Sequence, residues 1–329
     1  MCTSLTLTTT DSKHLLGRNM DFPTDLGQNV LLTPRNYVWR DSLDASRQTR
    51  FAVLGMGMAA GDYIGYADGF NEAGLMCATL YHPGFATYQP RLEASDDNAL
   101  APSDVVFWLL SQFSELKAAS EALRHTTLLD VPLPLLGVTP PLHWILSDRS
   151  GACLVAEVLK DGLHLHNNPV GVMTNAPDLP WHLAHLRQFI NLHAAQVADT
   201  VWENLRLTPF GEGSGAVGLP GDFTPPSRFV RAAFLKHHLT GIDTELSGVT
   251  GLFHVLAACA LPKGAVVTAQ GQEDITLYTS VMCSESATYY YTGYDNQQLT
   301  AIHLFHEDLN ATRPKLFPFK REQAVALEN

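Results

Sequence analysis

Apolar and polar residues alternate along the first strand that the sequence predicts. Leucines alternate with threonine and serine between residues 3 and 10, and a period of two is typical of a β-strand. The polar residues 11–13 predict a turn, after which a second apolar run begins. A hairpin folded about this turn places Cys2 opposite Met20 or Asp21 by antiparallel pairing. The start of the chain is therefore expected to lie beside the end of the second strand.

The same reasoning outlines the rest of the chain. Strands are predicted at residues 29–34, 51–58, 75–80, 142–146, 152–158, 163–165, 170–174, 266–269, 275–283, 288–293 and 300–304, with 163–165 and 170–174 paired to each other. Helical spacing of apolar residues predicts helices over 105–124, 180–193, 227–238 and 245–260. Residues 208–226, rich in Gly and Pro, predict a long loop, and the tail after residue 306 an extended segment. Strands come in sets with helices between them, which favours antiparallel sheets covered by helices over a parallel sheet.

Composition narrows the class of protein. The chain has 329 residues, of which 46% are hydrophobic and 16% charged, as in an ordinary globular protein with a large core. A formal net charge of −12 argues against nucleic acid and against anionic membrane surfaces as partners. The N-terminus lacks the pattern of a signal peptide, and no apolar run is long enough to span a membrane. The five cysteines are odd in number and scattered, which predicts reduced thiols and a cytoplasmic protein.

Two glycine patterns and two histidine pairs imitate ligand sites. Residues 55–61 and 213–218 carry closely spaced glycines, but neither stretch opens a helix as a nucleotide-binding loop does. We interpret both as loop glycines. His182 with His185, and the neighbours 237–238, lack acidic or cysteine partners at the spacing of a metal site and are interpreted as surface histidines. No metal and no cofactor are expected.

Cys2 is the candidate for chemistry. It is small enough for Met1 to be trimmed, which leaves one residue carrying both a thiol and a free α-amine. The amine can accept the thiol proton, the amine-as-base form of an activated nucleophile. In the predicted hairpin Arg18 and Asp21 flank this residue; the carboxylate can hold the amine, and the guanidinium favours thiolate over thiol. The alternative is an inert Cys2 beside a surface ion pair of Arg18 and Asp21.

Several stretches together resemble the choloylglycine hydrolase family of N-terminal nucleophile amidases, which includes bile salt hydrolases and penicillin V acylases. The stretches are Met1-Cys2-Thr3, Gly17-Arg18-Asn19-Met20-Asp21, Asn71-Glu72-Ala73-Gly74-Leu75, Leu142-His143-Trp144, Thr174-Asn175 followed by Pro177, Leu219-Pro220-Gly221-Asp222 running to Ser227-Arg228-Phe229-Val230-Arg231, and Thr288-Tyr289-Tyr290-Tyr291 running to Tyr294-Asp295. The resemblance covers nearly the whole chain. It implies an α+β fold, a four-layer αββα sandwich of the N-terminal nucleophile type formed by one domain over residues 1–329. It also implies a homotetramer.

The resemblance further implies roles for single residues. Cys2 attacks the amide carbonyl and becomes acylated, and water then releases the acid. Asp21 orients the α-amine, while Arg18 and Arg228 tune the thiol and balance the charge of the site. Taken alone, Arg228 would be an ordinary arginine in the first turn of a helix.

Two donors for the tetrahedral oxyanion follow from the same resemblance. They are the side-chain amide of Asn175 and the backbone N–H of Tyr81. One pre-placed donor of this kind is typically worth about 2.7–4 kcal/mol of barrier. Taken alone, Asn175 would be a turn residue before Ala176 and Pro177.

Tyr81 also indicates a subclass. Bile salt hydrolases carry Asn at the position of Tyr81 in the tract 79–84, whereas penicillin V acylases resemble this chain in having Tyr there. A phenol ring offers a flat apolar face to an aromatic acyl group. Apolar residues near the site are expected to line an acyl pocket on loops: Met20, Phe22, Leu26, Met58, Tyr63, Ile64, Tyr81 and Leu135.

The sequence therefore predicts an amidase that cleaves linear N-acyl amides through Cys2, with penicillin V acylase-like preference for phenoxyacyl or aliphatic acyl groups. A small-molecule N-acyl amide is the expected partner. Conjugated bile salts and N-acyl homoserine lactones are the alternative substrates, because an apolar pocket discriminates poorly among acyl groups. Outside this class, the alternative is an inactive relative that binds acyl amides.

Overall fold

Two antiparallel sheets form the body of the protein. The computed structural model describes residues 1–61, 63–91 and 98–329. One sheet has six strands in the order β14 (Val172–Met173), β1 (Cys2–Thr8), β2 (His14–Phe22), β17 (Ile275–Cys283), β18 (Thr288–Gly293) and β19 (Thr300–His303). The other has eight, in the order β13 (Gly162–Asn167), β12 (Cys153–Leu159), β11 (Leu142–Ser147), β8 (Met76–Tyr81), β7 (Tyr63–Asn71), β6 (Val53–Ala60), β3 (Asn29–Thr33) and β20 (Lys315–Phe317).

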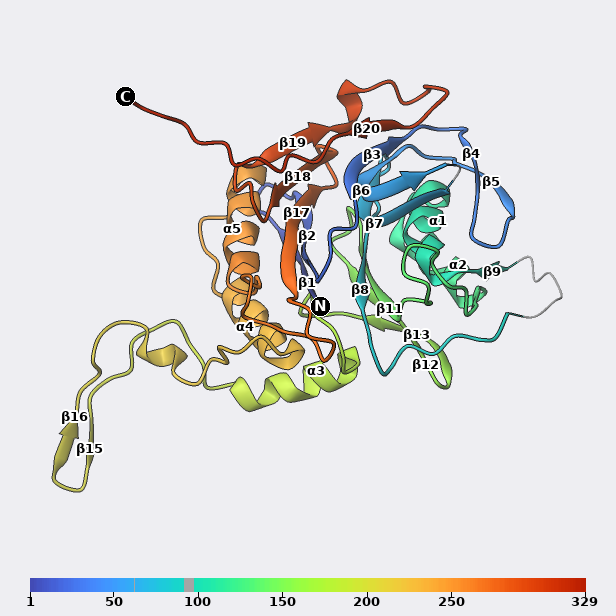
Figure 1. Ribbon diagram of the computed structural model, residues 1–329. Coiled ribbons are helices and arrows are strands. Elements are labelled where there is room, and N and C mark those ends of the chain that lie inside the picture. Colours follow the sequence, from blue (N-terminus) through green and yellow to red (C-terminus); the bar gives the residue numbers. More distant parts are fainter. Residues whose placement is uncertain (62, 92–97) are drawn as a thin grey trace.

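Helices cover the outer faces of both sheets, as Figure 1 shows. Helices α4 (Pro225–His237) and α5 (Glu245–Ala257) pack on the six-stranded sheet, with α3 (Leu179–Leu186) at the end of α4; α1 (Val105–Gln112) and α2 (Leu116–Arg124) cover the eight-stranded sheet. One apolar cluster fills the space between the sheets and beneath α4 and α5, and a second lies beneath α1 and α2. The prediction of an α+β four-layer sandwich is confirmed.

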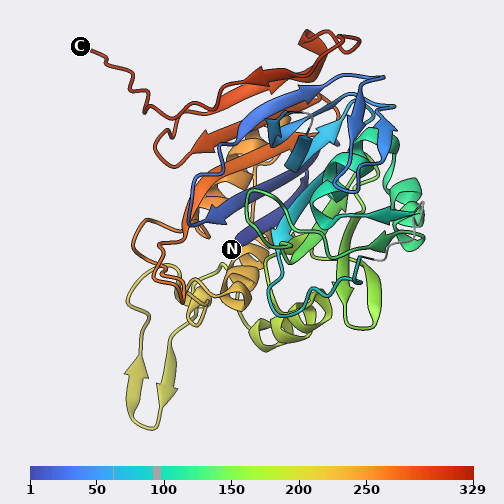
Figure 2. The ribbon, with the colours of Figure 1, turned by 45° about the vertical axis from the view of Figure 1, so that its right-hand side comes forward.

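Smaller elements decorate this body. They are the pairs β4 (Val38–Arg40) with β5 (Ser46–Gln48), β9 (Ala99–Leu100) with β10 (Thr127–Leu128) and β15 (Thr200–Trp202) with β16 (Leu205–Leu207), and the 3₁₀ turns η1 (Pro102–Asp104), η2 (Arg187–Phe189), η3 (Ser214–Ala216) and η4 (Leu304–His306). The β15–β16 hairpin projects away from the sandwich in both views (Figures 1 and 2). No helix among the described residues has the length and hydrophobicity needed to cross a bilayer.

The helix predicted over 105–124 is two helices. Helix α1 ends where Phe113 turns extended, with φ −119° and ψ 143°. The buried carboxylate of Asp148 then accepts a hydrogen bond from the Leu116 N–H at 2.7 Å, which satisfies an orphan donor at the start of α2. The helix predicted over 180–193 is also shorter, because α3 passes into the 3₁₀ turn η2.

One strand prediction is wrong in its pairing, and another strand is not formed. Residues 163–165 lie in β13, which pairs with β12, whereas β14 pairs with β1. Residues 266–269 form no named strand, and Val267 makes a single bridge to Glu273. The sequence patterns also missed the β15–β16 hairpin and the pairing of β20 with β3 inside the extended tail. These errors share a cause. The alternation of apolar and polar residues within a short segment does not indicate which other strand that segment pairs with.

The glycines at 55 and 57 belong to strand β6, so their interpretation as loop glycines is wrong. Gly55 lies directly opposite Gly69 of β7. A Cβ built on Gly55 would come within 2.1 Å of the Asp68 carbonyl oxygen. Glycine is needed here because β6 and β7 approach each other too closely for a side chain.

We therefore expect Gly55→Ala to lower the free energy of unfolding by about 1–3 kcal/mol or more, the usual range for overpacking. Denaturant titration measures it. The matched control is Gly211→Ala on the exposed loop, where a Cβ meets nothing within 4 Å. Equal unfolding midpoints for the two variants would contradict the close-approach explanation.

Candidate active site

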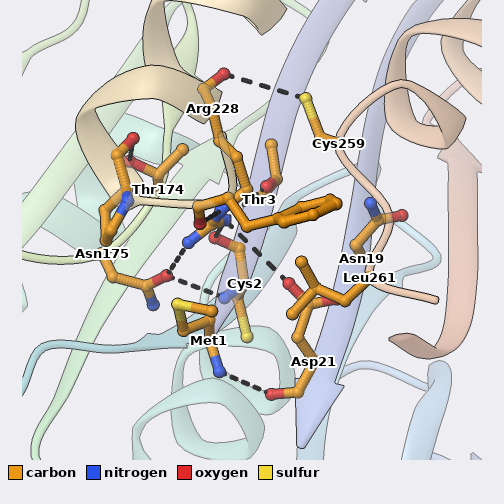
Figure 3. A network of polar contacts seen from close by, with 12 residues as sticks. Met1, Cys2, Thr3, Asn19, Asp21, Thr174, Asn175, Arg228, Cys259 and Leu261 are labelled. Atoms are coloured by element: carbon orange, nitrogen blue, oxygen red, sulfur yellow. Dashed lines mark hydrogen bonds and ion pairs between the residues drawn. The ribbon is translucent and has the colours of Figure 1, made fainter. Parts of the chain in front are cut away.

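Cys2 is the first residue of β1, opposite Met20 of β2, as the hairpin prediction required. Its side chain is buried, with 3% of its surface exposed. The Sγ atom accepts a hydrogen bond from Arg18 Nη2 at 2.9 Å. The backbone N–H of Cys2 donates to Asn175 Oδ1 at 2.8 Å (Figure 3). Segments far apart in the sequence therefore meet at this residue.

Arg18 and Asp21 lie on opposite faces of the six-stranded sheet. Their spacing of three residues on one strand dictates this, because side chains alternate between faces. Arg18 points to the eight-stranded sheet and donates to the Ala67 carbonyl at 3.2 Å, whereas Asp21 faces Arg228 of α4. Both are buried, so the alternative of a surface ion pair between Arg18 and Asp21 is wrong.

Asp68 is the residue behind Arg18 that sequence reasoning missed. Its carboxylate pairs with Arg18 Nη1 at 3.4 Å and accepts hydrogen bonds from the hydroxyls of Tyr278 at 2.6 Å, Ser280 at 3.2 Å and Tyr289. Burial raises the pKa of both tyrosines well above the usual value, so both phenols keep the proton they donate. The available signal was a lone acid in an otherwise uncharged strand.

Asp21 presents one carboxylate oxygen without a hydrogen-bond partner among the described residues. Its Oδ1 accepts from Thr276 Oγ1 at 2.6 Å, while the buried Oδ2 has only Arg228 Nη1, 3.9 Å away. Burial raises the pKa of the Asp21 carboxyl, against the opposing effects of the Met1 ammonium and Arg228. The Met1 ammonium donates to the Asp21 backbone carbonyl at 2.7 Å and to Asp274 at 3.1 Å. The cation at the start of the chain is thus bound to the Asp21 backbone and to the Asp274 carboxylate.

Arg228 joins the start of β1 to Asn175. It lies in the first turn of α4, with its side chain fully buried. Nη1 donates to the Cys2 carbonyl at 2.5 Å and to Thr3 Oγ1 at 2.7 Å, and Nη2 donates to Asn175 Oδ1 at 2.7 Å (Figure 3). Burial lowers the pKa of the guanidinium, with Asp21 opposing that effect.

Asn175 and the backbone of Tyr81 face each other. Asn175 Nδ2 donates to the Tyr81 carbonyl at 2.6 Å. The ladder between β8 and β11 continues in the bond from the His82 N–H to the Pro141 carbonyl. An antiparallel ladder alternates the direction of its backbone groups, so the N–H and C=O of Tyr81 both turn away from β11. The amide of Asn175 and the N–H of Tyr81 are therefore available on one side of the site.

An apolar cavity opens beside Cys2. Seven of the eight predicted pocket residues line it: Met20, Phe22, Leu26, Met58, Tyr63, Tyr81 and Leu135. Arg18 and Asp21 also reach its wall. The cavity therefore combines an apolar wall with the polar groups around the thiol.

Ile64 does not line the cavity. It is buried among the apolar residues between the eight-stranded sheet and α1. Met58 and Tyr63 were expected on a loop but lie in strands β6 and β7. Side-chain alternation along β7 explains why Tyr63 lines the cavity and Ile64 does not, because the two residues must face opposite sides of the sheet.

Three histidines lie behind Asn175, and one of them corrects a prediction. His182 was interpreted as a surface residue but is 2% exposed. His82 and His143 are also buried, and their ligand atoms lie within 4.8 Å of those of Glu157, as in a metal cluster. The two rings, however, stack in parallel, 4.1 Å apart with a 10° interplanar angle. Parallel rings cannot both direct an in-plane lone pair at one ion, so the stack does not fit a metal as it stands.

The fold and the comparisons with known proteins now define the class. Two antiparallel sheets between helical layers are the architecture of the N-terminal nucleophile hydrolases. The family model for linear amide C–N hydrolases of the choloylglycine hydrolase family matches residues 2–317. The chain belongs to this family and is a linear amide hydrolase.

Individual relatives and solved structures agree with this family assignment. The bile salt hydrolase/transferase of Clostridium perfringens is 36% identical over 326 residues, 99% of each chain. A crystal structure of a variant conjugated bile acid hydrolase from the same organism matches with a TM-score of 0.94, at 36% identity and 100% coverage of both chains. Penicillin V acylase from Agrobacterium tumefaciens matches with a TM-score of 0.77 at 20% identity, covering 99% of this chain and 100% of that one, and shares the fold.

Removing the carboxylate behind Arg18 is expected to destabilise the protein. Asp68→Asn leaves a buried guanidinium without its counter-charge, and breaking a buried pair in this way typically costs about 3–5 kcal/mol. Denaturant titration at neutral pH measures the loss.

The control is Asp199→Asn, which breaks the exposed pair with Arg206 (2.7 Å). An exposed pair is worth about 0–1 kcal/mol. If Asp68→Asn were as stable as this control, the carboxylate would not be needed to compensate Arg18.

Proposed function

We propose that this amidase hydrolyses glycine- or taurine-conjugated bile salts, with Cys2 as the nucleophile after removal of Met1. The observation that carries the reaction is the position of the Cys2 sulfur. It is held by Arg18 at 2.9 Å on the wall of an apolar cavity. The bile-salt substrate is supported by the 36%-identical relative that spans the whole chain. The penicillin V acylase likeness, at 20% identity, concerns the fold alone, so the predicted preference for phenoxyacyl amides becomes the second candidate.

The first half of the proposed reaction acylates Cys2. The free α-amine takes the thiol proton, and the sulfur attacks the amide carbonyl carbon. The carbonyl oxygen becomes an oxyanion, which in this proposal accepts hydrogen bonds from Asn175 Nδ2 and the Tyr81 N–H. When the tetrahedral intermediate collapses, the C–N bond breaks. The departing nitrogen takes the proton from the α-ammonium, and a thioester remains on Cys2.

The second half releases the acid. The α-amine, neutral again, accepts a proton from water as the water oxygen attacks the thioester. The same two donors receive the second oxyanion, and collapse breaks the C–S bond with return of the proton to sulfur. Oδ2 of Asp21 is buried and accepts no hydrogen bond from any described residue, and we assign it as the partner of the ammonium form of the amine. This oxygen supports the removal of Met1, because it is an acceptor to which no described residue donates while Met1 is present.

The second candidate substrate is penicillin V, and one contact favours it. The Tyr81 ring lines the cavity and packs edge-to-face on Phe22, with ring centroids 6.2 Å apart. This aromatic corner suits a flat phenoxyacetyl group. Tyr81 also stands at the position where the resemblance to bile salt hydrolases leads us to expect Asn. Tyr81 and Phe22 thus give the cavity an aromatic contact that binding of a steroid would not need.

A side-by-side hydrolysis assay with glycocholate and penicillin V separates the candidates. We expect a higher kcat/KM for glycocholate, and we expect Tyr81→Asn to raise the ratio of glycocholate to penicillin V turnover by about tenfold, the size of effect of one altered pocket contact. Cys2→Ala should abolish both activities. Cys153→Ala, which removes a buried thiol on β12 remote from the cavity lining, should leave them intact.

Each failure has its own meaning. A higher kcat/KM for penicillin V would reverse the choice of substrate but keep the mechanism. Turnover by Cys2→Ala at the original rate would end the nucleophile assignment. A folded wild-type protein from which Met1 is absent, and that binds both amides without cleaving either, would point to an inactive acyl-amide-binding relative.

A further inference from the structure

We propose that His143 and His182 are positioning residues that hold the backbone on both sides of the Asn175 peptide and so aim its side-chain amide. The inference rests on the proposed function, because it concerns the oxyanion donor of that reaction. It extends to two histidines that lie outside the cavity lining. We call the pair the imidazole clamp.

The clamp consists of two matching hydrogen bonds. His143 Nε2 lies 3.0 Å from the Thr174 carbonyl oxygen, and His182 Nε2 lies 3.0 Å from the Asn175 carbonyl oxygen. A carbonyl oxygen only accepts, so each imidazole carries a proton on Nε2. His143 comes from β11 of the eight-stranded sheet, and His182 comes from α3. The consecutive carbonyls of Thr174 and Asn175 therefore accept hydrogen bonds from two different elements, β11 and α3.

Glu157 supports the clamp from behind. His143 Nδ1 lies 3.2 Å from Glu157 Oε1. Two lone pairs would repel at this distance, so one proton lies between them and the pair is neutral as a whole. Burial lowers the pKa of His143 to about 3 and raises that of Glu157, which favours the neutral imidazole. Both Glu157 oxygens also accept from the Leu179 N–H at 3.2 Å, at the start of α3. One carboxyl thus anchors the first imidazole and the helix that carries the second.

The side chain of Asn175 explains why its backbone must be fixed. Its Oδ1 accepts from the Cys2 N–H and from Arg228, and its Nδ2 donates to the Tyr81 carbonyl. These partners come from three separate elements. Pre-placed donors stabilise an oxyanion only when their geometry is set before the reaction, and an error of about 1 Å can cost on the order of 100-fold in rate. The clamp supplies that fixed geometry from the side away from the substrate.

The test compares two amides that differ in reach. Glutamine places its side-chain nitrogen near the Nε2 position of a histidine, whereas asparagine places it near Nδ1. We expect His143→Gln and His182→Gln to keep most of the kcat for glycocholate. We expect His143→Asn and His182→Asn to lose it by about 10- to 100-fold, with little change in KM because neither histidine lines the cavity.

The matched control is His82→Phe. His82 stacks on His143, and neither of its ring nitrogens has a hydrogen-bond partner among the described residues. Phenylalanine keeps the ring in the stack and removes the nitrogens. This variant should turn over substrate at the wild-type rate.

Crystal structures of the asparagine variants provide a readout that does not depend on the substrate. We expect Asn175 Nδ2 to move out of hydrogen-bonding distance of the Tyr81 carbonyl, while the glutamine variants keep the 2.6 Å contact. An unmoved Asn175 amide, or equal kcat for the asparagine and glutamine variants, would overturn the clamp. A wild-type enzyme that failed to cleave either amide would count against the proposed function, and the position of Asn175 would still decide the clamp.

Discussion

Two arginine side chains with no exposed surface flank the first residue of β1, and the rest of the site is arranged to tolerate them. A buried charge without a partner costs several kcal/mol, so each guanidinium needs both an acid and a set of carbonyl or hydroxyl acceptors. Arg18 has Asp68 and the Ala67 carbonyl on the side of the eight-stranded sheet. Arg228 faces Asp21 and binds the Cys2 carbonyl on the side of the helices. The six-stranded sheet separates these two compensated pairs, and the thiol lies at the start of its strand β1.

Layering explains how one wall of the cavity is polar and another apolar. The space between the sheets is filled by apolar side chains, and the cavity opens at the end of that space, where β1 begins. Polar groups reach this point from the interior of β2, from the end of β14 and from the first turn of α4, as with Arg18, Asn175 and Arg228. An acyl amide has the same division, with an apolar acyl group on one side of a polar carbonyl. The proposed substrate and the cavity thus share one division into an apolar and a polar part.

Local pattern was sufficient for the first hairpin, where the two strands show clear apolar runs. The period of two between residues 3 and 10 and the turn after it predicted that Cys2 lies opposite Met20 or Asp21, and the structure pairs it with Met20. Local pattern failed where the partner is remote in sequence: β14 joins β1 rather than β13, and the acid behind Arg18 is Asp68, fifty residues away. His182 was misjudged for the same reason, since a helix pattern does not reveal that one face meets a backbone carbonyl of Asn175. The resemblance to a known family named Asn175 and Arg228, which composition and periodicity alone would have left as a turn residue and a helix residue.

The covalent role of Cys2 is tested most directly by trapping the acyl-enzyme. Active enzyme is mixed with excess glycocholate, quenched with acid during turnover and digested, and the mass of the N-terminal peptide is measured. A peptide that begins at Cys2 and carries a cholyl group as a hydroxylamine-labile thioester is the expected result. A fully active enzyme whose N-terminal peptide still contains Met1, or a cholyl group found on any residue other than Cys2, would contradict the assignment.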